Sequence, residues 1–307
     1  QQKNDFVILS DQINLGEHEK SLSISRQLGL ESFSTKEYKH AHMLLGHTAR
    51  TWNDPQSQFV LGLMHEKGLG TIKNDKLHHY WMNEAAQGGY AAAQNALANM
   101  YIDGVFVLKS KKLAKYWYTK AAEQGHQNSQ FSLAKTYEVR NRDIKDKEMA
   151  LYWYTESANQ GNVPAQLKLG HMYSKGKGVE KNNEEAFKWW MKVAESGNVL
   201  GQVMVGTMFA SGTGVAQNLK VAVKWDKLAS AQGSAVAQYN LASSYAMGQG
   251  VLTDYVRSYM WYDLSSYNGQ KSAEKNRDSI SKMMTLDQLS KAQEMASRCL
   301  ASSYVDC

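Results

Sequence analysis

Small, apolar and polar side chains recur along this chain with a fixed period of 36 residues. Tryptophan holds one position of the period in six successive units: Trp81, Trp117, Trp153, Trp189, Trp225 and Trp261. Glutamine holds a second position: Gln58, Gln94, Gln130, Gln166, Gln202 and Gln238. Glycine holds a third: Gly89, Gly125, Gly161, Gly197, Gly233 and Gly269. Repetition at a period of roughly 20 to 50 residues is typical of proteins built from stacked units. The pattern therefore predicts six copies of one supersecondary unit, joined without insertions.

Each unit is predicted to contain a first helix, a turn and a second helix. In the fourth unit, Leu169 and Tyr173 are four residues apart, which places them on one face of a helix. Gly176 and Gly178 predict the end of that helix, because glycine adopts left-handed backbone geometry without a steric penalty. The second helix is expected to begin after a side chain that can cap free amides: Asn74, Ser110, Asp146, Asn182, Asn218 or Asp254.

Three kinds of residue are predicted to form the core of every unit. They are the tryptophan, one tyrosine in most units, and an aliphatic residue of the first helix: Leu61, Leu97, Leu133, Leu169, Val205 or Leu241. Small residues before the ladder glycine leave room for the large rings, so neighbouring units can interlock. We therefore predict an all-α fold, a right-handed α/α superhelical solenoid of helix-turn-helix repeats of 36 residues.

The periodic segment divides the chain into four parts. Residues 1–17 show no periodicity and are expected to form a flexible lead-in. Residues 18–54 keep a faint copy of the unit, with Leu45 at the tryptophan position, and are predicted to be a degenerate N-terminal capping repeat. Residues 55–270 hold the six repeats. Residues 271–307 are predicted to form C-terminal capping helices and a tail, with a capping box at residues 285–288.

Four motifs of the unit resemble those of the Sel1-like repeat family, relatives of the tetratricopeptide solenoids. They are Gly-x-x-Tyr at 170–173, Gly-x-Gly-Val at 176–179, Ala-x-x-Trp at 186–189 and the small pair before Gln-Gly at 121–125. The tail after Gly269 also resembles that of bacterial members, which are often exported. The resemblance implies a helix-pair array that acts as a protein–protein adaptor and has no catalytic centre. Arg140, Arg142 and Phe106 depart from the pattern by replacing turn glycines, so those turns should differ.

Charge and composition narrow the partner class only slightly. The net charge is +6 and the pI is near 9.0, but basic and acidic residues alternate along most helices, which favours a solvated surface over a nucleic-acid site. No apolar run approaches the roughly 20 residues that a membrane-spanning helix needs.

The two cysteines and the first residue bear on cellular location. Cys299 and Cys307 are close in sequence and lie outside the repeats, so we predict a disulfide that tethers the tail. The chain begins with Gln1, and either a removed signal peptide or a truncation explains that start. We expect a periplasmic or secreted protein.

No catalytic motif is present, and we expect neither enzymatic activity nor a cofactor. Histidines are frequent in the N-terminal units, and His42 and His78 are 36 residues apart. A metal site there is disfavoured, because no second histidine or carboxylate ladder completes a tetrahedral set of ligands.

The binding face is predicted by analogy with tetratricopeptide repeats, from positions two, five and nine after each ladder glutamine. This rule also includes Val60. The residues proposed for the concave face are Asn99, Lys135, Lys168, His171, Lys175, Met204, Thr207, Asn240, Ser243 and Met247. Lysines and a histidine in the middle of this set favour a protein or peptide partner that is acidic. The sequence assigns no oligomeric state.

An alternative function is binding of a glycan or cell-wall polymer, which would regulate an envelope enzyme. Sugar rings stack on exposed aromatic faces. Four aromatic residues that directly follow a ladder tryptophan are the candidates for such faces: Tyr118, Tyr154, Trp190 and Tyr262.

Overall fold

The computed structural model describes residues 19–140, 144–305 and 307 of the 307-residue chain. Every regular element in these ranges is an α-helix, which confirms the predicted all-α solenoid of helix pairs. The predicted lead-in, residues 1–17, lies outside the described residues. Residues 19–34 are helical. The helices that follow are α2 (Tyr38–Thr51), α3 (Pro55–Lys67), α4 (Asp75–Gln87), α5 (Ala91–Asp103), α6 (Lys111–Glu123), α7 (Gln127–Arg140), α8 (Ile144–Asn159), α9 (Val163–Lys175), α10 (Asn183–Glu195), α11 (Val199–Ser211), α12 (Leu219–Ser230), α13 (Ala235–Met247), α14 (Tyr255–Tyr267), α15 (Ser272–Ser281) and α16 (Leu286–Ala301).

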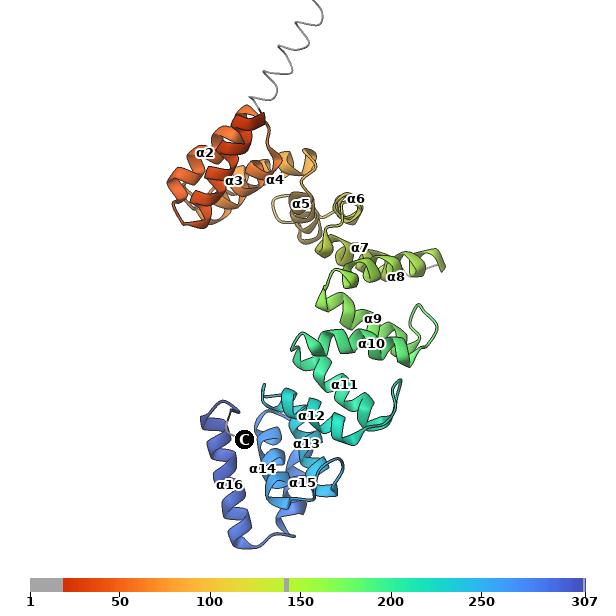
Figure 1. Ribbon diagram of the computed structural model, residues 1–307. Coiled ribbons are helices and arrows are strands. Elements are labelled where there is room, and N and C mark those ends of the chain that lie inside the picture. The colour runs from red at the N-terminus through yellow and green to blue at the C-terminus, as the bar shows by residue number, and fades with distance from the viewer. Residues whose placement is uncertain (1–18, 141–143, 306) are drawn as a thin grey trace, which may run out of the picture. The chain divides into compact units, whose positions relative to one another are not determined.

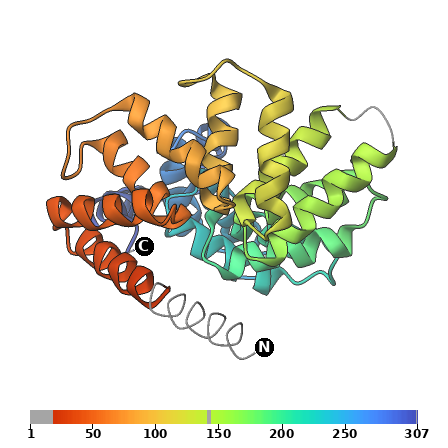
Figure 2. The same cartoon turned by 90° about the horizontal axis from the view of Figure 1, so that it is seen from above.

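The helices belong to two compact units, residues 1–142 and 143–307, called unit 1 and unit 2 below. In unit 1, each helix from α2 to α7 packs on the next (Figures 1 and 2). In unit 2, each helix from α8 to α14 does the same, and α15 and α16 both pack on α14 (Figure 1). Within each unit, the chain thus buries its apolar faces against the next element in sequence.

The aliphatic position of the first helix forms the centre of the core, as predicted. Leu61, Leu97, Leu133, Leu169, Val205 and Leu241 are all fully buried. The tryptophan prediction is confirmed for Trp81, Trp153, Trp189 and Trp261 and wrong for Trp117 and Trp225, which are half-buried. The residue directly after each tryptophan is buried in all six repeats, including the two repeats whose tryptophan is half-buried.

Side-chain caps begin the second helices in five of the six repeats. Asn74, Ser110, Asn182, Asn218 and Asp254 each accept a hydrogen bond from the backbone amide three residues later. The same prediction is wrong for Asp146, because α8 begins at Ile144 and already contains Asp146 in its first turn. The preceding α7 runs on to Arg140, since the glycine that ends the other first helices is absent there. Arg142 lies outside the described residues.

The second turn glycine of a repeat meets the preceding repeat in three places. Gly70, Gly214 and Gly250 have φ angles of 68°, 74° and 77°. A Cβ atom on any of them would overlap a backbone carbonyl group near the start of the preceding repeat's second helix. Phe106 holds the same position in its repeat with φ of 64°, so this turn keeps the left-handed backbone but cannot make the same close approach. The prediction that this turn differs is wrong for its backbone: Ser110 N donates to Tyr101 O at 2.9 Å, as Asn74 N donates to His65 O at 2.9 Å one repeat earlier.

The ladder glutamines join neighbouring elements through their side-chain amides. In α5, Gln94 Nε2 donates to the carbonyl of Ala86 at 3.1 Å, and Gln124 Nε2 donates to Gln94 Oε1 at 2.8 Å. In unit 2, Gln238 Nε2 donates to the carbonyl of Ser230 at 3.3 Å. The glutamines therefore add a second hydrogen bond to carbonyl groups at the ends of second helices, which also accept from backbone amides of the following turn.

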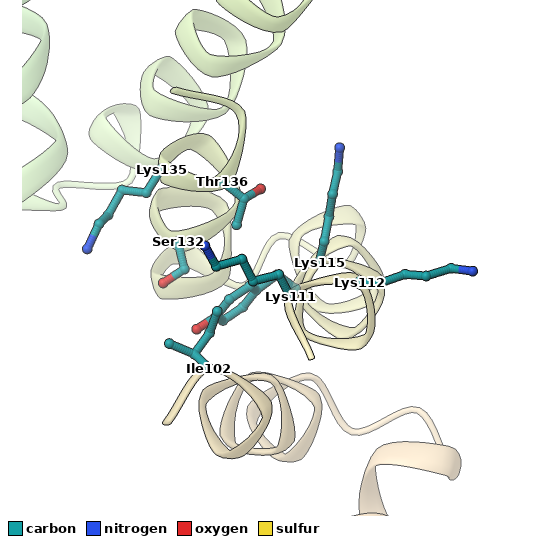
Figure 3. A pocket seen from close by; sticks show the side chains of 8 residues that line it. Ile102, Lys111, Lys112, Lys115, Ser132, Lys135 and Thr136 are labelled. Atoms are coloured by element: carbon teal, nitrogen blue, oxygen red, sulfur yellow. The ribbon is translucent and has the colours of Figure 1, made fainter. Parts of the chain in front are cut away.

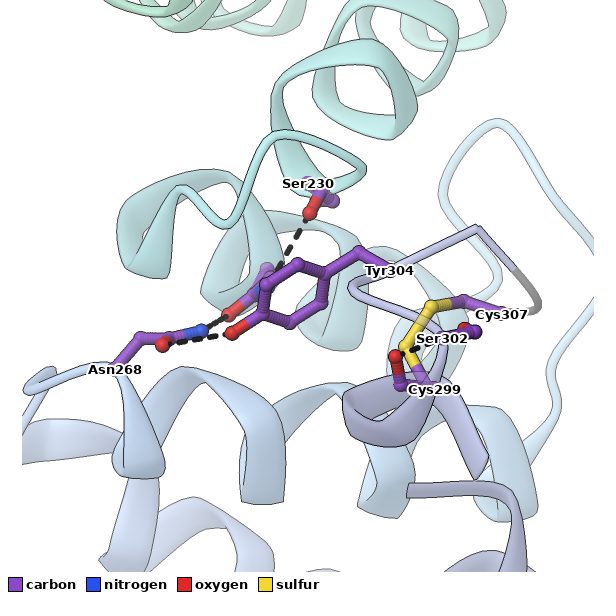
Figure 4. The surroundings of a disulfide bond; sticks show 7 residues. Ser230, Asn268, Cys299, Ser302, Tyr304 and Cys307 are labelled. Carbon is purple, nitrogen blue, oxygen red and sulfur yellow. Dashed lines mark hydrogen bonds between the residues drawn. A yellow bond between two sulfur atoms is a disulfide. The ribbon is translucent and has the colours of Figure 1, made fainter. Parts of the chain in front are cut away.

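The C-terminal segment covers the last repeat and carries a disulfide between Cys299 and Cys307 (Figure 4). Tyr304 lies within the loop that this disulfide closes and donates a hydrogen bond from its hydroxyl group to Asn268 Oδ1 at 2.9 Å. Asn268 in turn donates to Gln238 Oε1 at 2.9 Å. The predicted capping box at Thr285 and Gln288 begins α16 and is confirmed.

The turn glycines generate a prediction about stability. Gly214→Ala should lower the free energy of unfolding by about 2 to 4 kcal/mol, because the new methyl group would overlap the Asn183 carbonyl. Gly178→Ala is the matched control, since its φ is 80° but a Cβ there would meet only the Met172 side chain, at 3.6 Å. The control should cost about 1 kcal/mol, for the left-handed backbone alone. Urea denaturation measures both values, and equal costs would show that close approach is unimportant.

The disulfide generates a second prediction. Protein taken from an oxidising compartment should show no alkylation by iodoacetamide at Cys299 or Cys307 until it is reduced. Because the crosslink restricts the unfolded chain, reduction should also lower the free energy of unfolding, by about 2 kcal/mol. Mass spectrometry before and after reduction checks the first statement. Two alkylated cysteines in unreduced protein would contradict it.

Candidate functional site

The ten residues predicted to bind a partner lie on first helices and reach the surface. Asn99 and Lys135 lie on α5 and α7 of unit 1. The other eight lie on α9, α11 and α13 of unit 2. None of the ten is buried, although Lys168, Met204, Asn240 and Ser243 are half-buried. We call these ten residues the first-helix surface. The rule that selected them is wrong for Val60, which is buried in the core.

A second ladder of side chains lies directly beneath this surface. It consists of the residues after the ladder tryptophans: Met82, Tyr118, Tyr154, Trp190, Asp226 and Tyr262. The four aromatic residues proposed as sugar-stacking faces belong to this ladder and are only 1 to 6% exposed. The expectation that they are exposed is therefore wrong, and the physical reason is that this position of the second helix points into the core between helices.

The polar ends of the buried ladder contact the first-helix surface from behind. In unit 1, Tyr118 Oη donates to Asn99 Oδ1 at 2.5 Å. In unit 2, the hydroxyl groups of Ser243 and Tyr262 are hydrogen-bonded at 2.8 Å. These bonds satisfy buried hydroxyl groups and fix the orientation of the surface residues that accept or share them.

Rings and charges in α9 make similar contacts. The His171 ring meets Trp190 edge to face with 5.3 Å between ring centroids, and the Lys168 ammonium group lies 5.8 Å from the centroid of Tyr154. Burial, followed by the charges of Lys168 and Lys175, lowers the pKa of His171. His171 is consequently neutral at pH 7, and the lysines carry the positive charge of this helix face.

Asp226 is the one member of the buried ladder with an acidic side chain. It is 3% exposed, and Asn240 Nδ2 donates to its Oδ1 at 3.3 Å. Burial raises the pKa of Asp226 to about 7, and the hydrogen bond from Asn240 opposes that shift. Asp226 therefore occupies the core most favourably in its protonated form.

Exposed aromatic rings occur at a position that the sequence reasoning did not select. Tyr80, Tyr116 and Tyr152 precede the ladder tryptophans and are each about half exposed. Each packs edgewise on the adjacent indole ring, with 4.8 to 5.0 Å between centroids. The period of 36 residues was the signal that could have identified them.

The N-terminal histidines form ring contacts rather than a metal-ligand set. His42 meets His65 at 5.3 Å between ring centroids, while His78 Nδ1 is hydrogen-bonded to the carbonyl of Gly62 at 2.9 Å. Burial is the main cause that lowers the pKa of His42 and of His65. No group of three or more His, Cys, Asp or Glu suited to a metal ion occurs within residues 19–140 and 144–305.

A cavity of about 610 Å³ lies in unit 1 between α5, α6 and α7 (Figure 3). Its lining residues are Ile102, Lys111, Lys112, Lys115, Tyr118, Ser132, Lys135 and Thr136. Burial raises the pKa of Tyr118, a hydrogen bond with Ser132 opposes the shift, and the charge of Asp103 adds to it. Of the lining residues, the sequence reasoning selected Lys135 for partner binding and Tyr118 for sugar stacking. The run of lysines from 109 to 115 was a visible signal for the others.

A family model for the Sel1 repeat matches six consecutive segments, residues 55–90, 91–126, 128–162, 163–198, 199–234 and 235–270. The chain belongs to the Sel1 repeat family. The matched segments agree with the 36-residue period and with the helix pairs of the structure. Sel1 repeats generally mediate protein–protein interaction and typically form non-catalytic scaffolds.

Two solved structures are similar to this Sel1 repeat protein. A protective antigen present in uropathogenic Escherichia coli strains, with an SLR fold, is 27% identical with a TM-score of 0.57; the match covers 95% of this chain and 72% of the antigen. A Sel1 repeat protein from Oxalobacter formigenes is 28% identical with a TM-score of 0.62; the match covers 78% of this chain and 96% of that protein. No curated protein sequence matches the chain. None of the described helices is long and apolar enough to span a bilayer.

Asp226 generates a prediction about pH. Its pKa is raised in the folded protein, so its contribution to stability is full below about pH 4 and is lost as pH rises through about 7. We expect the parent to lose about 2 kcal/mol between pH 5 and pH 8 relative to Asp226→Asn, which has no proton to release. Urea denaturation of both proteins at matched pH values measures this difference and cancels the histidine contributions that they share. Parallel pH profiles would contradict the prediction.

Proposed function

We propose that this Sel1 repeat protein is a non-catalytic adaptor that binds an acidic segment of a partner protein on its first-helix surface. The observation that supports this most is the exposure of the ten predicted residues above a fixed, hydrogen-bonded layer. The buried ladder fixes the shape of this surface, whereas the side chains on the surface differ from repeat to repeat. That combination suits recognition of a specific partner by many small contacts.

Charge supports an acidic partner. Lys135 in unit 1 is exposed; in unit 2, Lys175 is exposed and Lys168 is half-buried on the same helix, α9. The whole chain carries a net charge of +6. Positive side chains on a binding surface attract acidic partners over about 10 Å at 0.1 M salt, and this attraction weakens as salt rises.

We further propose a periplasmic or secreted location. The two cysteines joined at the C-terminus suit an oxidising compartment, where disulfides persist. Similarity to a protein described as a protective antigen of uropathogenic Escherichia coli supports the same location. The glycan alternative has no support from the residues first proposed for it, because their rings are buried.

Charge reversal tests the adaptor function. The assay is photo-crosslinking in cells, with a photoreactive residue in place of Asn99 or Met247 of this protein. In this assay, Lys135→Glu with Lys168→Glu should abolish capture of the partner. The melting temperature should stay within a few degrees of the parent, because substitutions of surface charges usually change stability by only about 0.5 kcal/mol.

The matched control reverses the charge of one second-helix lysine in each unit. Lys76→Glu with Lys224→Glu changes the net charge by the same amount at two exposed positions outside the first-helix surface. The control should capture the partner as the parent does. Equal capture by the Lys135/Lys168 variant would show that the first-helix surface is not the binding site.

A further inference from the structure

The cavity between α5, α6 and α7 combines a positive rim with a largely apolar floor. Lys111, Lys112 and Lys115 come from the first two turns of α6, and Lys135 comes from α7. Figure 3 shows the Lys111 side chain directed toward Ser132, whereas Lys112, Lys115 and Lys135 extend outward. Ile102, the ring of Tyr118 and the methyl group of Thr136 line the same space. The volume of about 610 Å³ is that of an ordinary ligand pocket.

The four ammonium groups have no carboxylate partner among the residues that the structure describes. Two of them lie against aromatic rings instead. Lys115 Nζ is 3.7 Å from the centroid of Tyr137, and Lys135 Nζ is 5.7 Å from that of Phe131. Elsewhere in the same chain, lysines such as Lys188 do pair with a neighbouring acid. Negative groups supplied by a ligand would therefore meet unneutralised positive charge.

We propose that this cavity binds an acidic segment of a partner protein, in which an apolar side chain enters the pocket and flanking carboxylates pair with the lysines. The inference rests on the proposed adaptor function and assigns a second, deeper anchor to it. Ile102, which is exposed, and the methyl group of Thr136 provide the contact surface for the apolar side chain. Lys111 and Lys112, which are not part of the first-helix surface, provide charge for the carboxylates on one side, and Lys135 provides it on the other.

The apolar floor distinguishes this ligand from a simple anion. A phosphate or sulfate ion would use the ammonium groups but would leave Ile102 and the Thr136 methyl group without a contact. A peptide that places a leucine between acidic residues would use both. Burial of that side chain adds to the affinity, while the charges mainly set specificity and the rate of association.

Fluorescence anisotropy with the full-length protein tests the proposal. The probe is a fluorescein-labelled pentapeptide with leucine at its centre and two acidic residues on each side. Replacing its leucine by glycine should weaken binding about tenfold, because the apolar contact is lost. Lys111→Gln with Lys112→Gln should also weaken binding of the leucine peptide about tenfold.

The control variant removes the same charge outside the cavity. Lys39→Gln with Lys76→Gln changes two exposed lysines of unit 1, and Lys76 holds the position of Lys112 one repeat earlier. It should bind the leucine peptide as the parent does. Equal weakening in both variants, equal affinity for both peptides, no binding to the parent, or full displacement by inorganic phosphate at constant ionic strength would each overturn the inference.

The cell experiment separates this inference from the adaptor function. If the Lys111/Lys112 variant captures the crosslinked partner fully while the Lys135/Lys168 variant does not, the adaptor function holds and the cavity is not its anchor. If the peptide results hold but cells yield no crosslinked partner, the cavity is a ligand site and the adaptor function fails.

Discussion

The hydrogen bonds of the ladder glutamines hold each repeat to its neighbours, and the remaining contacts are arranged around them. A carbonyl oxygen has two lone pairs, and the carbonyl groups at the ends of these second helices accept one bond from a backbone amide of the following turn and a second from a glutamine. Gln94, Gln130, Gln166 and Gln238 each supply an amide to the carbonyl eight residues earlier. A glutamine reaches that carbonyl only if the following first helix starts at a fixed distance from it. This geometric requirement is one reason why the repeats keep a constant length of 36 residues.

The same helix spacing places a buried layer beneath the first-helix surface. Once the glutamines fix the ends of the helices, the side chain after the ladder tryptophan must enter the space between them. Its polar end then meets the first helix, as Tyr118 meets Asn99 and Tyr262 meets Ser243. A buried layer of this kind limits the rotamers of the residues above it. The exposed side chains can change with little effect on the layer beneath.

Much of the fold could be predicted because it depends on local and periodic features. The caps at Asn74 and Asn182, the capping box at Thr285 and the buried leucines follow from residue type and spacing alone. The N-cap role of Asp146 was predicted wrongly. The glycine that ends the other first helices is absent from α7, and α8 begins earlier than the pattern predicts. The exposure of Tyr118 and Trp190 was also assigned wrongly. Two adjacent aromatic residues on a helix point about 100° apart, and only the packing of the third helix decides which of them is buried.

The candidate site was only partly predictable for a related reason. Periodicity identifies which positions can vary, so Lys135 and His171 were selected. It does not identify positions where three helices enclose a space, because that depends on side-chain size in each of them. Lys111 and Lys112 line a cavity because side chains of α5, α6 and α7 together enclose a space beside them.

The hydrogen bonds at the C-terminal end have a consequence for how such a chain can change in length. The glutamine hydrogen bonds between repeats recur at similar separations: nine for Gln58 and its carbonyl, eight for Gln94 and its carbonyl, and thirty for Gln124 with Gln94 or Asn268 with Gln238. Duplication or loss of 36 residues leaves all these separations intact, whereas any other length breaks several at once. Tyr304 donates a hydrogen bond to the side-chain oxygen of Asn268, so the C-terminal segment covers this end of the last repeat. Repeats can therefore be added by duplication upstream of Tyr304. The segment that carries the disulfide would then follow the last repeat of the longer array.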